Sequence, residues 1–296
     1  MEPVFFVPNV QEKVWGGEKL AEDFDKTIPG LRIGESFELS ILPQSKSYVR
    51  SGEYSGMMLD ELYKIRRDLF GTTSSEFPFN IKLTDAKGVM PVVIHDQLAE
   101  RHRPIEGLYV IEAGPNAQFV VGTTIQNSLE YINVMKSGTM ENHLKLVPAK
   151  TGDAYIVRSG IAHSFRNGAL GYVIGAYHKH NTKIYDPNKD NIDLESVLET
   201  IIFDGEIEKQ HPEKKDAHCS RVIHTSEFTV EIIDAEDAPY TDCILAHFAA
   251  YTALESGQIL YEGKTKRYRK GDTFIMPAEY GEFTLAGGKL IKAYVS

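Results

Sequence analysis

The sequence is poor in the features that mark secreted or membrane proteins. Its 296 residues include only two cysteines, Cys219 and Cys243, which are far apart in the chain. This argues against a disulfide framework or a cysteine-built zinc site and favours a cytoplasmic protein. No apolar run approaches the ~20 residues that a membrane span requires. The N-terminus also lacks the basic and long apolar segments of a secretory signal, so we expect no membrane partner.

Positive charge is also scarce. The formal net charge is −10, which argues against general nucleic-acid binding. A hydrophobic content of 42% and a charged content of 25% are ordinary for a globular protein. If the substrate is anionic, the positive charge that binds it must therefore be concentrated locally. The sequence does not indicate an oligomeric state.

Most of the chain is predicted to form short strands joined by turns, and a few segments have helical spacing. The helical candidates have apolar faces within residues 59–69, 125–135 and 194–201. Asp193 is placed to cap the third of them, and the second should end near Gly138. Strands are expected, among other places, at 108–111, 118–121, 228–233, 259–261 and 283–285.

A weak internal repeat indicates two related β-units. Residues 150–157 (KTGDAYIV) align with residues 269–276 (RKGDTFIM), and this alignment places Glu282 opposite His163. We therefore predict a mainly β protein of two cupin-type (jelly-roll) β-barrels with a few short helices. The expected N-terminal domain spans 1–203 and contains the metal site. A polar linker at 204–218 leads to a degenerate C-terminal domain at 219–296.

One segment carries a specific motif. Residues 152–167 (GDAYIVRSGIAHSFRN) resemble the second signature of the cupin superfamily, with Arg158 in place of its proline. The two Gly-containing turns flank a short strand, so His163 is expected to point into the barrel. His95 ends the apolar run 92–94, and Glu106 begins the strand that follows. Two imidazoles and a carboxylate are typical of a catalytic zinc site, so we predict a metal centre at His95, Glu106 and His163.

The likeness extends along nearly the whole chain. Residues 13–17 (KVWGG), 33–40 (IGESFELS), 77–83 (FPFNIKL) and 270–278 (KGDTFIMPA) occur in the order typical of short bacterial type I mannose-6-phosphate isomerases. The chain therefore resembles that family, whose members are zinc-dependent aldose–ketose isomerases. The resemblance implies interconversion of mannose 6-phosphate and fructose 6-phosphate, with the metal on His95, Glu106 and His163. Iron, manganese or nickel would also suit such ligands.

The resemblance also suggests which cations serve the substrate. We expect catalytic roles for Lys82 and Lys183, and substrate binding by Arg103 and Lys179. The proton could be carried by Lys82, if its pKa is depressed, or by a metal-bound hydroxide. Several positions depart from the family pattern: Val93 replaces a polar metal ligand, and lysines 179 and 183 replace an aspartate and an arginine. The departures leave two other readings open, a related isomerase of another sugar and a non-catalytic sugar-binding or regulatory protein.

Overall fold

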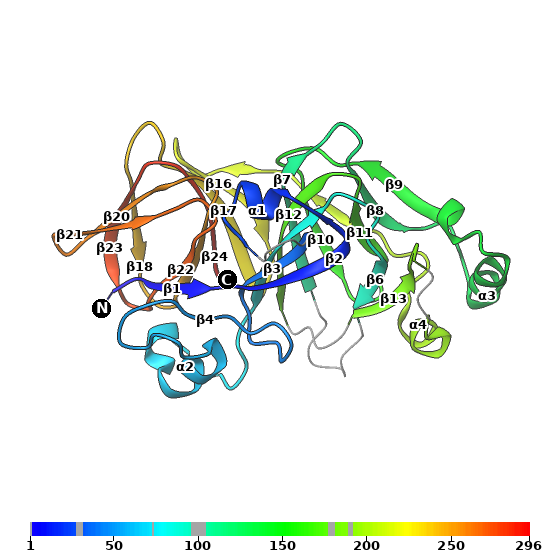
Figure 1. The fold of residues 1–296 in the computed structure, drawn as a ribbon, viewed down its shortest axis with the longest axis horizontal. Coiled ribbons are helices and arrows are strands. Elements are labelled where there is room, and N and C mark those ends of the chain that lie inside the picture. Colours follow the sequence, from blue (N-terminus) through cyan, green and yellow to red (C-terminus); the bar gives the residue numbers. More distant parts are fainter. Residues whose placement is uncertain (1, 28–31, 73, 96–104, 177–180, 189–191) are drawn as a thin grey trace.

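The computed structural model describes residues 2–27, 32–72, 74–95, 105–176, 181–188 and 192–296. Four β-sheets lie in consecutive layers along the long axis of the molecule (Figure 1). This confirms the prediction of a mainly β protein with few short helices. None of the helices in the described ranges has the length and apolar character needed to cross a bilayer.

The two outer layers are the smaller sheets. The five-stranded sheet has the order β13 (Asn181–Tyr185), β6 (Val92–His95), β11 (His163–Arg166), β8 (Gln118–Thr123) and β9 (Leu144–Pro148). The four-stranded sheet has the order β18 (Tyr240–Ile244), β23 (Gly281–Ala286), β20 (Gly257–Tyr261) and β21 (Lys264–Tyr268).

The two inner layers are larger. The seven-stranded sheet has the order β14 (Glu208–Gln210), β10 (Ala154–Arg158), β7 (Ile105–Ala113), β12 (Ala169–Ala176), β5 (Asn80–Ala86), β3 (Ile33–Leu39) and β2 (Asn9–Gly17). The eight-stranded sheet has the order β15 (Glu213–Lys214), β16 (Cys219–His224), β17 (Phe228–Asp234), β24 (Lys289–Val295), β19 (Ala249–Ala253), β22 (Thr273–Met276), β1 (Val4–Val7) and β4 (Tyr48–Val49).

Strand pairing repeats between the two halves, as the sequence repeat predicted. In the first unit β12 lies between β5 and β7, and in the second β24 lies between β17 and β19. Likewise β11 lies between β6 and β8, and β23 lies between β18 and β20. The described strands of each unit pack as two facing sheets, as in a jelly roll, and do not close into a continuous barrel.

Within the described residues the buried apolar side chains form four clusters, and three of them lie in the spaces between the layers. Leu108, Tyr155 and Val173 of the seven-stranded sheet meet Phe119 and Phe165 of the five-stranded sheet. In the second unit Tyr251 and Phe274 meet Ile259, Tyr268 and Phe283. The largest core joins the two units, because apolar residues of β5 and β12 pack with those of β17 and β24. Each residue of β12 is buried, as expected for a strand covered on both faces.

A buried ion pair also ties the two inner sheets together. Lys26 Nζ lies 2.8 Å from Glu38 Oε2, and their side chains are 6% and 0% exposed. Lys26 also donates to the carbonyl of Gly271 at 2.6 Å. Glu38 lies on β3 and accepts hydrogen bonds from Ser36 at 2.6 Å and from Thr273, on β22, at 3.0 Å. The network therefore crosses from the first unit to the second.

The helices lie at the ends of the layers, and two of the expected caps are present. They are α1 (Lys19–Glu22), α2 (Leu59–Ile65), η1 (Arg67–Phe70), α3 (Ser128–Ser137), η2 (Met140–His143) and α4 (Leu194–Thr200). The Asp193 carboxylate caps α4 by accepting from the backbone N–H of Ser196 at 3.2 Å. Gly138 ends α3 with a φ of 67°, which glycine adopts without strain. The expected helix at 59–69 is instead α2 followed by the 3₁₀ turn η1, because Arg66 leaves helical geometry.

The polar stretch 204–218 changes sheets. Its first strand, β14, pairs with β10, and its second, β15, pairs with β16. A segment that precedes the first unit in the chain also joins the sheet of the second unit. β1 pairs with β22 and β4 and so extends the eight-stranded sheet. The expected domain boundaries at 203 and 219 stay a prediction.

Candidate metal centre

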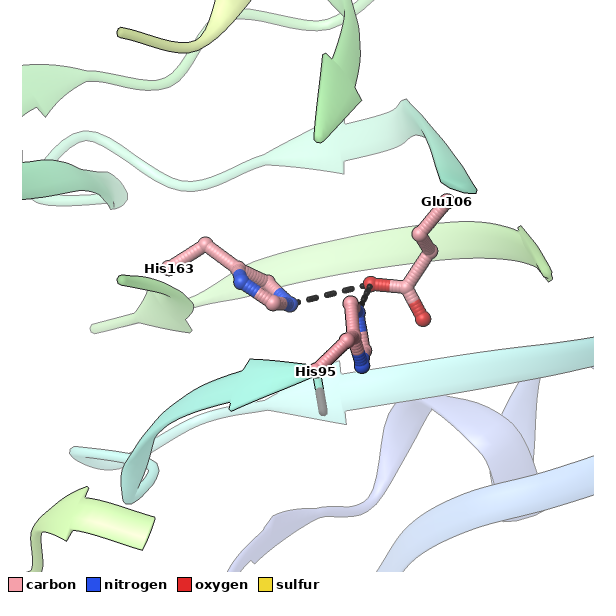
Figure 2. Close-up of side chains that lie close together, drawn as sticks. All are labelled: His95, Glu106 and His163. Atoms are coloured by element: carbon pink, nitrogen blue, oxygen red, sulfur yellow. Dashed lines mark hydrogen bonds and ion pairs between the residues drawn. The ribbon is translucent and has the colours of Figure 1, made fainter. Parts of the chain in front are cut away.

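His95, Glu106 and His163 come together at one end of the space between the two sheets of the first unit (Figure 2). Their possible ligand atoms lie within 4.8 Å of one another. The three side chains are 1%, 6% and 3% exposed. His95 lies on β6 and His163 on β11, whereas Glu106 lies on β7. β6 and β11 are paired in the five-stranded sheet, whereas β7 belongs to the seven-stranded sheet facing it.

The turn before β11 places His163. Gly160 has a φ of +76°, and a Cβ atom there would lie 2.6 Å from the carbonyl oxygen of Thr200. The turn is therefore built for glycine on both conformational and steric grounds. From it the chain enters β11, where His163 and Phe165 face the interior between the sheets. The Gly-containing motif thus delivers an imidazole to the interior.

Both imidazoles direct Nε2 toward one carboxylate oxygen. Glu106 Oε2 lies 3.2 Å from His95 Nε2 and 3.0 Å from His163 Nε2, as the dashed lines in Figure 2 indicate. On the far side of each ring, Nδ1 faces an oxygen: Asn181 Oδ1 at 2.8 Å from His95 and the Ile161 carbonyl at 2.9 Å from His163. These acceptors favour Nδ1–H, which leaves each Nε2 with a lone pair available for a metal.

This arrangement fits a divalent cation. When both rings are neutral and protonated on Nδ1, as a bound metal requires, the Nε2–H donors to Glu106 are absent, and two nitrogen lone pairs and a carboxylate oxygen converge. A cation among these three atoms would remove the repulsion. Ligand atoms around a tetrahedral zinc lie about 3.3 Å apart. Glu106 Oε2 lies 3.2 Å and 3.0 Å from the two Nε2 atoms, close to that value. The donor set of two imidazoles and one carboxylate leaves further coordination positions for water or substrate.

Burial and charge set the protonation of the centre. Burial and the nearby His95 lower the pKa of His163, although its hydrogen bond to Glu106 acts in the opposite direction. The lowered pKa favours the neutral imidazole, the form that binds metal. For Glu106, burial alone would raise the pKa. The attraction of His95 and hydrogen bonds from both histidines outweigh it and hold the pKa well below its usual range. The carboxylate is therefore ionised at neutral pH.

A cavity of about 30 Å³ adjoins the centre. Glu106 and His163 line it together with Lys82, Thr84 and Val93. Val93, which stands where the resemblance placed a polar ligand, is paired with His163 across β6 and β11. An apolar side chain therefore occupies that part of the wall.

Lys82 lies beside the centre as a cation. Its Nζ is 2.7 Å from Glu35 Oε1, and Lys13 Nζ is 3.0 Å from Glu35 Oε2. Burial alone would lower the pKa of Lys82, but attraction to Glu35 and Glu106 and the hydrogen bond to Glu35 raise it. A depressed pKa was the condition for Lys82 to act as the base, and this condition is not met; its catalytic role stays a prediction. The partner Glu35 was missed as a site residue although it lies in the motif at 33–40.

The other expected cations lie elsewhere or outside the described residues. Lys183 on β13 forms an ion pair with Asp186 at 2.8 Å and is 40% exposed. It does not line the described cavity. Arg103 and Lys179 fall outside the described ranges. Asn181, which orients His95, was missed because only the pairing of β13 with β6 places it opposite that histidine.

The second unit lacks the corresponding ligands. The sequence alignment placed Glu282 opposite His163, but Glu282 is exposed and Phe283 faces the interior, paired with Asp242. The alignment therefore slips by one residue between β22 and β23. When the inward-facing positions of the two units are matched, Phe283 corresponds to His163 and Ala249 to Glu106. Phe283 and Ala249 are both buried in the apolar core of the second unit. The expectation that only the first unit keeps a metal-binding histidine agrees with this packing.

The fold and the site define a cupin-type jelly-roll protein with two histidines and one glutamate that could hold a divalent metal ion. Residues 4–109 match the family model described as phosphomannose isomerase type I, catalytic domain. The chain is 27% identical to the mannose-6-phosphate isomerase ManA of Bacillus subtilis, over 97% of this chain and 96% of that protein.

Solved structures give the same relationship. A crystal structure of mannose 6-phosphate isomerase from Bacillus subtilis has a TM-score of 0.90 and 27% identity, covering 99% of this chain and 100% of that one. A mannose 6-phosphate isomerase bound with zinc and yttrium has a TM-score of 0.79, with 100% of both chains covered, and at 14% identity it shows the fold alone. The chain is thus similar to mannose-6-phosphate isomerases along nearly its whole length, and its residues 4–109 match the type I catalytic domain.

Proposed function

We propose that the protein is a metal-dependent aldose–ketose isomerase that interconverts mannose 6-phosphate and fructose 6-phosphate. The observation that carries this proposal is the convergence of His95, Glu106 and His163 next to the partly buried Lys82, in a fold with a TM-score of 0.90 to a solved isomerase of that specificity. The comparisons give no support to a different sugar or to a non-catalytic role. We place the enzyme in the cytoplasm, because Cys219 and Cys243 are both free thiols.

The reaction transfers a proton between C1 and C2 of the sugar through an enediolate, so negative charge develops on the two oxygen atoms. His95, Glu106 and His163 would hold zinc, which when bound supplies positive charge to the reacting oxygens. Lys82 adds a second fixed positive charge at the same wall, because Glu35 and Glu106 keep it protonated. A cation of this kind stabilises developing negative charge, whereas a base would have to be neutral. Asn181 and the Ile161 carbonyl hold the two imidazoles in the metal-binding tautomer.

The phosphate group of the sugar must be bound by a local cluster of positive charge, because the net charge of the protein is −10. Lys183, Arg103 and Lys179 follow from the resemblance as candidates for this role. In the described part of the chain, Lys183 is half-exposed and held by Asp186, so its ammonium is oriented but accessible. Lysines bind phosphate as point charges, without the two parallel hydrogen bonds of arginine.

Metal analysis and an isomerase assay test the proposal together. We expect about one zinc per chain by elemental analysis of the purified protein, and turnover of mannose 6-phosphate that a chelator removes and added zinc restores. Turnover can be followed by coupling fructose 6-phosphate formation to a reporter enzyme. A metal-free protein without turnover after zinc addition would refute the enzyme assignment.

Lys82 and Lys13 allow a matched test of the proposed cation, because both pair with Glu35 and only Lys82 lines the cavity. Lys82→Met should lower kcat/KM for mannose 6-phosphate by about 100-fold, the effect typical of losing one group that stabilises developing charge. Lys13→Met removes the other partner of Glu35 and should change kcat/KM by less than about threefold. Equal losses in the two variants would mean that Lys82 acts only through Glu35.

A further inference from the structure

Thr84 buries a hydroxyl group that has no hydrogen-bond partner among the described residues. It lies on β5, two residues after Lys82, so the two side chains point to the same face of the sheet. Thr84 is 0% exposed, and within the described ranges its Oγ1 atom meets no donor or acceptor. Buried hydroxyl groups nearly always have a partner, because leaving one unsatisfied destabilises the fold.

The hydroxyl belongs to the wall of the cavity beside the metal centre. Glu106, His163 and Lys82 line that cavity, and Leu108, Phe119 and Val173 form its apolar part. A group bound there would therefore be within reach of the proposed metal and of the Lys82 ammonium. The volume of about 30 Å³ holds a group the size of one water molecule or one hydroxyl, and is too small for a hexose ring.

We propose that Thr84 Oγ1 hydrogen-bonds a hydroxyl group of the sugar and so helps to position it against the metal centre. The inference rests on the proposed isomerase function and adds a residue to it. The unsatisfied hydroxyl is then a polar group held ready for substrate. Without substrate it costs stability, and with substrate bound its hydrogen bond is made at a fully buried position, where such bonds discriminate strongly.

Replacing Thr84 by valine, which has nearly the same shape, tests this directly. Thr84→Val should lower kcat/KM for mannose 6-phosphate by about 10-fold or more, because the sugar hydroxyl would meet a methyl group. Zinc content should stay unchanged. The metal-free Thr84→Val protein should melt at the same or a higher temperature than the metal-free parent, because no unsatisfied hydroxyl is buried.

Thr252 is the matched control. It is also 0% exposed, but its Oγ1 lies 3.1 Å from Thr273 Oγ1 in the second unit. Thr252→Val should lower the melting temperature and leave kcat/KM unchanged, the reverse of the pattern expected for Thr84→Val.

A second pair of variants serves if Thr84→Val does not fold. Thr84→Ser and Thr84→Ala differ only in the hydroxyl, so kcat/KM of the serine variant should exceed that of the alanine variant by at least about fivefold. Equal kcat/KM values in this pair, or parental kcat/KM in Thr84→Val, would overturn the inference. These are also the results expected if only a water molecule occupies the cavity. Failure of the parent protein to isomerise the sugar phosphate would instead refute the proposed function.

Discussion

Replacing His163 with alanine is expected to remove the bound metal and to lower isomerase turnover by about 1000-fold or more. The imidazole supplies one of three converging ligand atoms, with its Nε2 3.0 Å from Glu106 Oε2. Without it, one imidazole and one carboxylate remain, too few to hold zinc against water. The loss of several kcal/mol of charge stabilisation gives the expected decrease in rate. Elemental analysis and the coupled isomerase assay measure the two effects on the same sample.

His224 provides the control for this variant. It is an exposed histidine of the second unit, and its Nδ1 contacts Thr229 Oγ1 at 2.8 Å. His224→Ala should keep about one zinc per chain and parental turnover. Full zinc content in His163→Ala would show that the metal binds elsewhere, and the proposed centre would have to be abandoned.

The largest expected effect on stability comes from Glu38→Ala. The substitution removes the carboxylate that faces the buried Lys26 ammonium and leaves it the hydrogen bond to the Gly271 carbonyl. It also removes the acceptor of Ser36 and Thr273. Breaking one side of a buried pair typically costs about 3–5 kcal/mol. For a chain of this size we expect the melting temperature to fall by roughly 10 °C, measured by thermal unfolding with calorimetry.

An exposed pair gives the comparison. Glu236 lies 3.2 Å from Lys289 Nζ, and the two side chains are 58% and 38% exposed. Glu236→Ala should cost less than about 1 kcal/mol, because water screens the pair. The double variant Lys26→Met/Glu38→Leu should recover much of the lost stability, since apolar side chains can replace a buried pair. A Glu38→Ala protein that melts within about 2 °C of the parent would contradict the assigned role of the network.

The sequence was sufficient to predict what depends on local pattern. The Gly-Asp turns and short apolar runs predicted the two related β-units, and the pairing of their strands repeats accordingly. Asp193 was correctly placed as the cap of α4. The candidate ligands His95, Glu106 and His163 also stand in recognisable local contexts, and the structure brings them within one cluster.

What could not be predicted depends on contacts between distant strands. Asn181 orients His95 only because β13 pairs with β6, and Glu35 reaches Lys82 only because β3 pairs with β5. The correspondence of His163 with Phe283 needed the direction in which each side chain points, since a shift of one residue reverses the face of a strand. The raised pKa of Lys82 likewise follows from two carboxylates that are distant in sequence.

The place of β1 has a consequence for how the protein is made. Residues Val4–Val7 are synthesised before the whole first unit, whereas their partner β22 (Thr273–Met276) belongs to the second unit. During synthesis the edge of β1 that pairs with β22 must therefore stay unpaired until the second unit has been made. An unpaired strand can associate with other chains, so the eight-stranded sheet is the part of the molecule most exposed to aggregation before release. Slow folding of nascent chains should thus harm the second unit first, although the metal centre lies in the first.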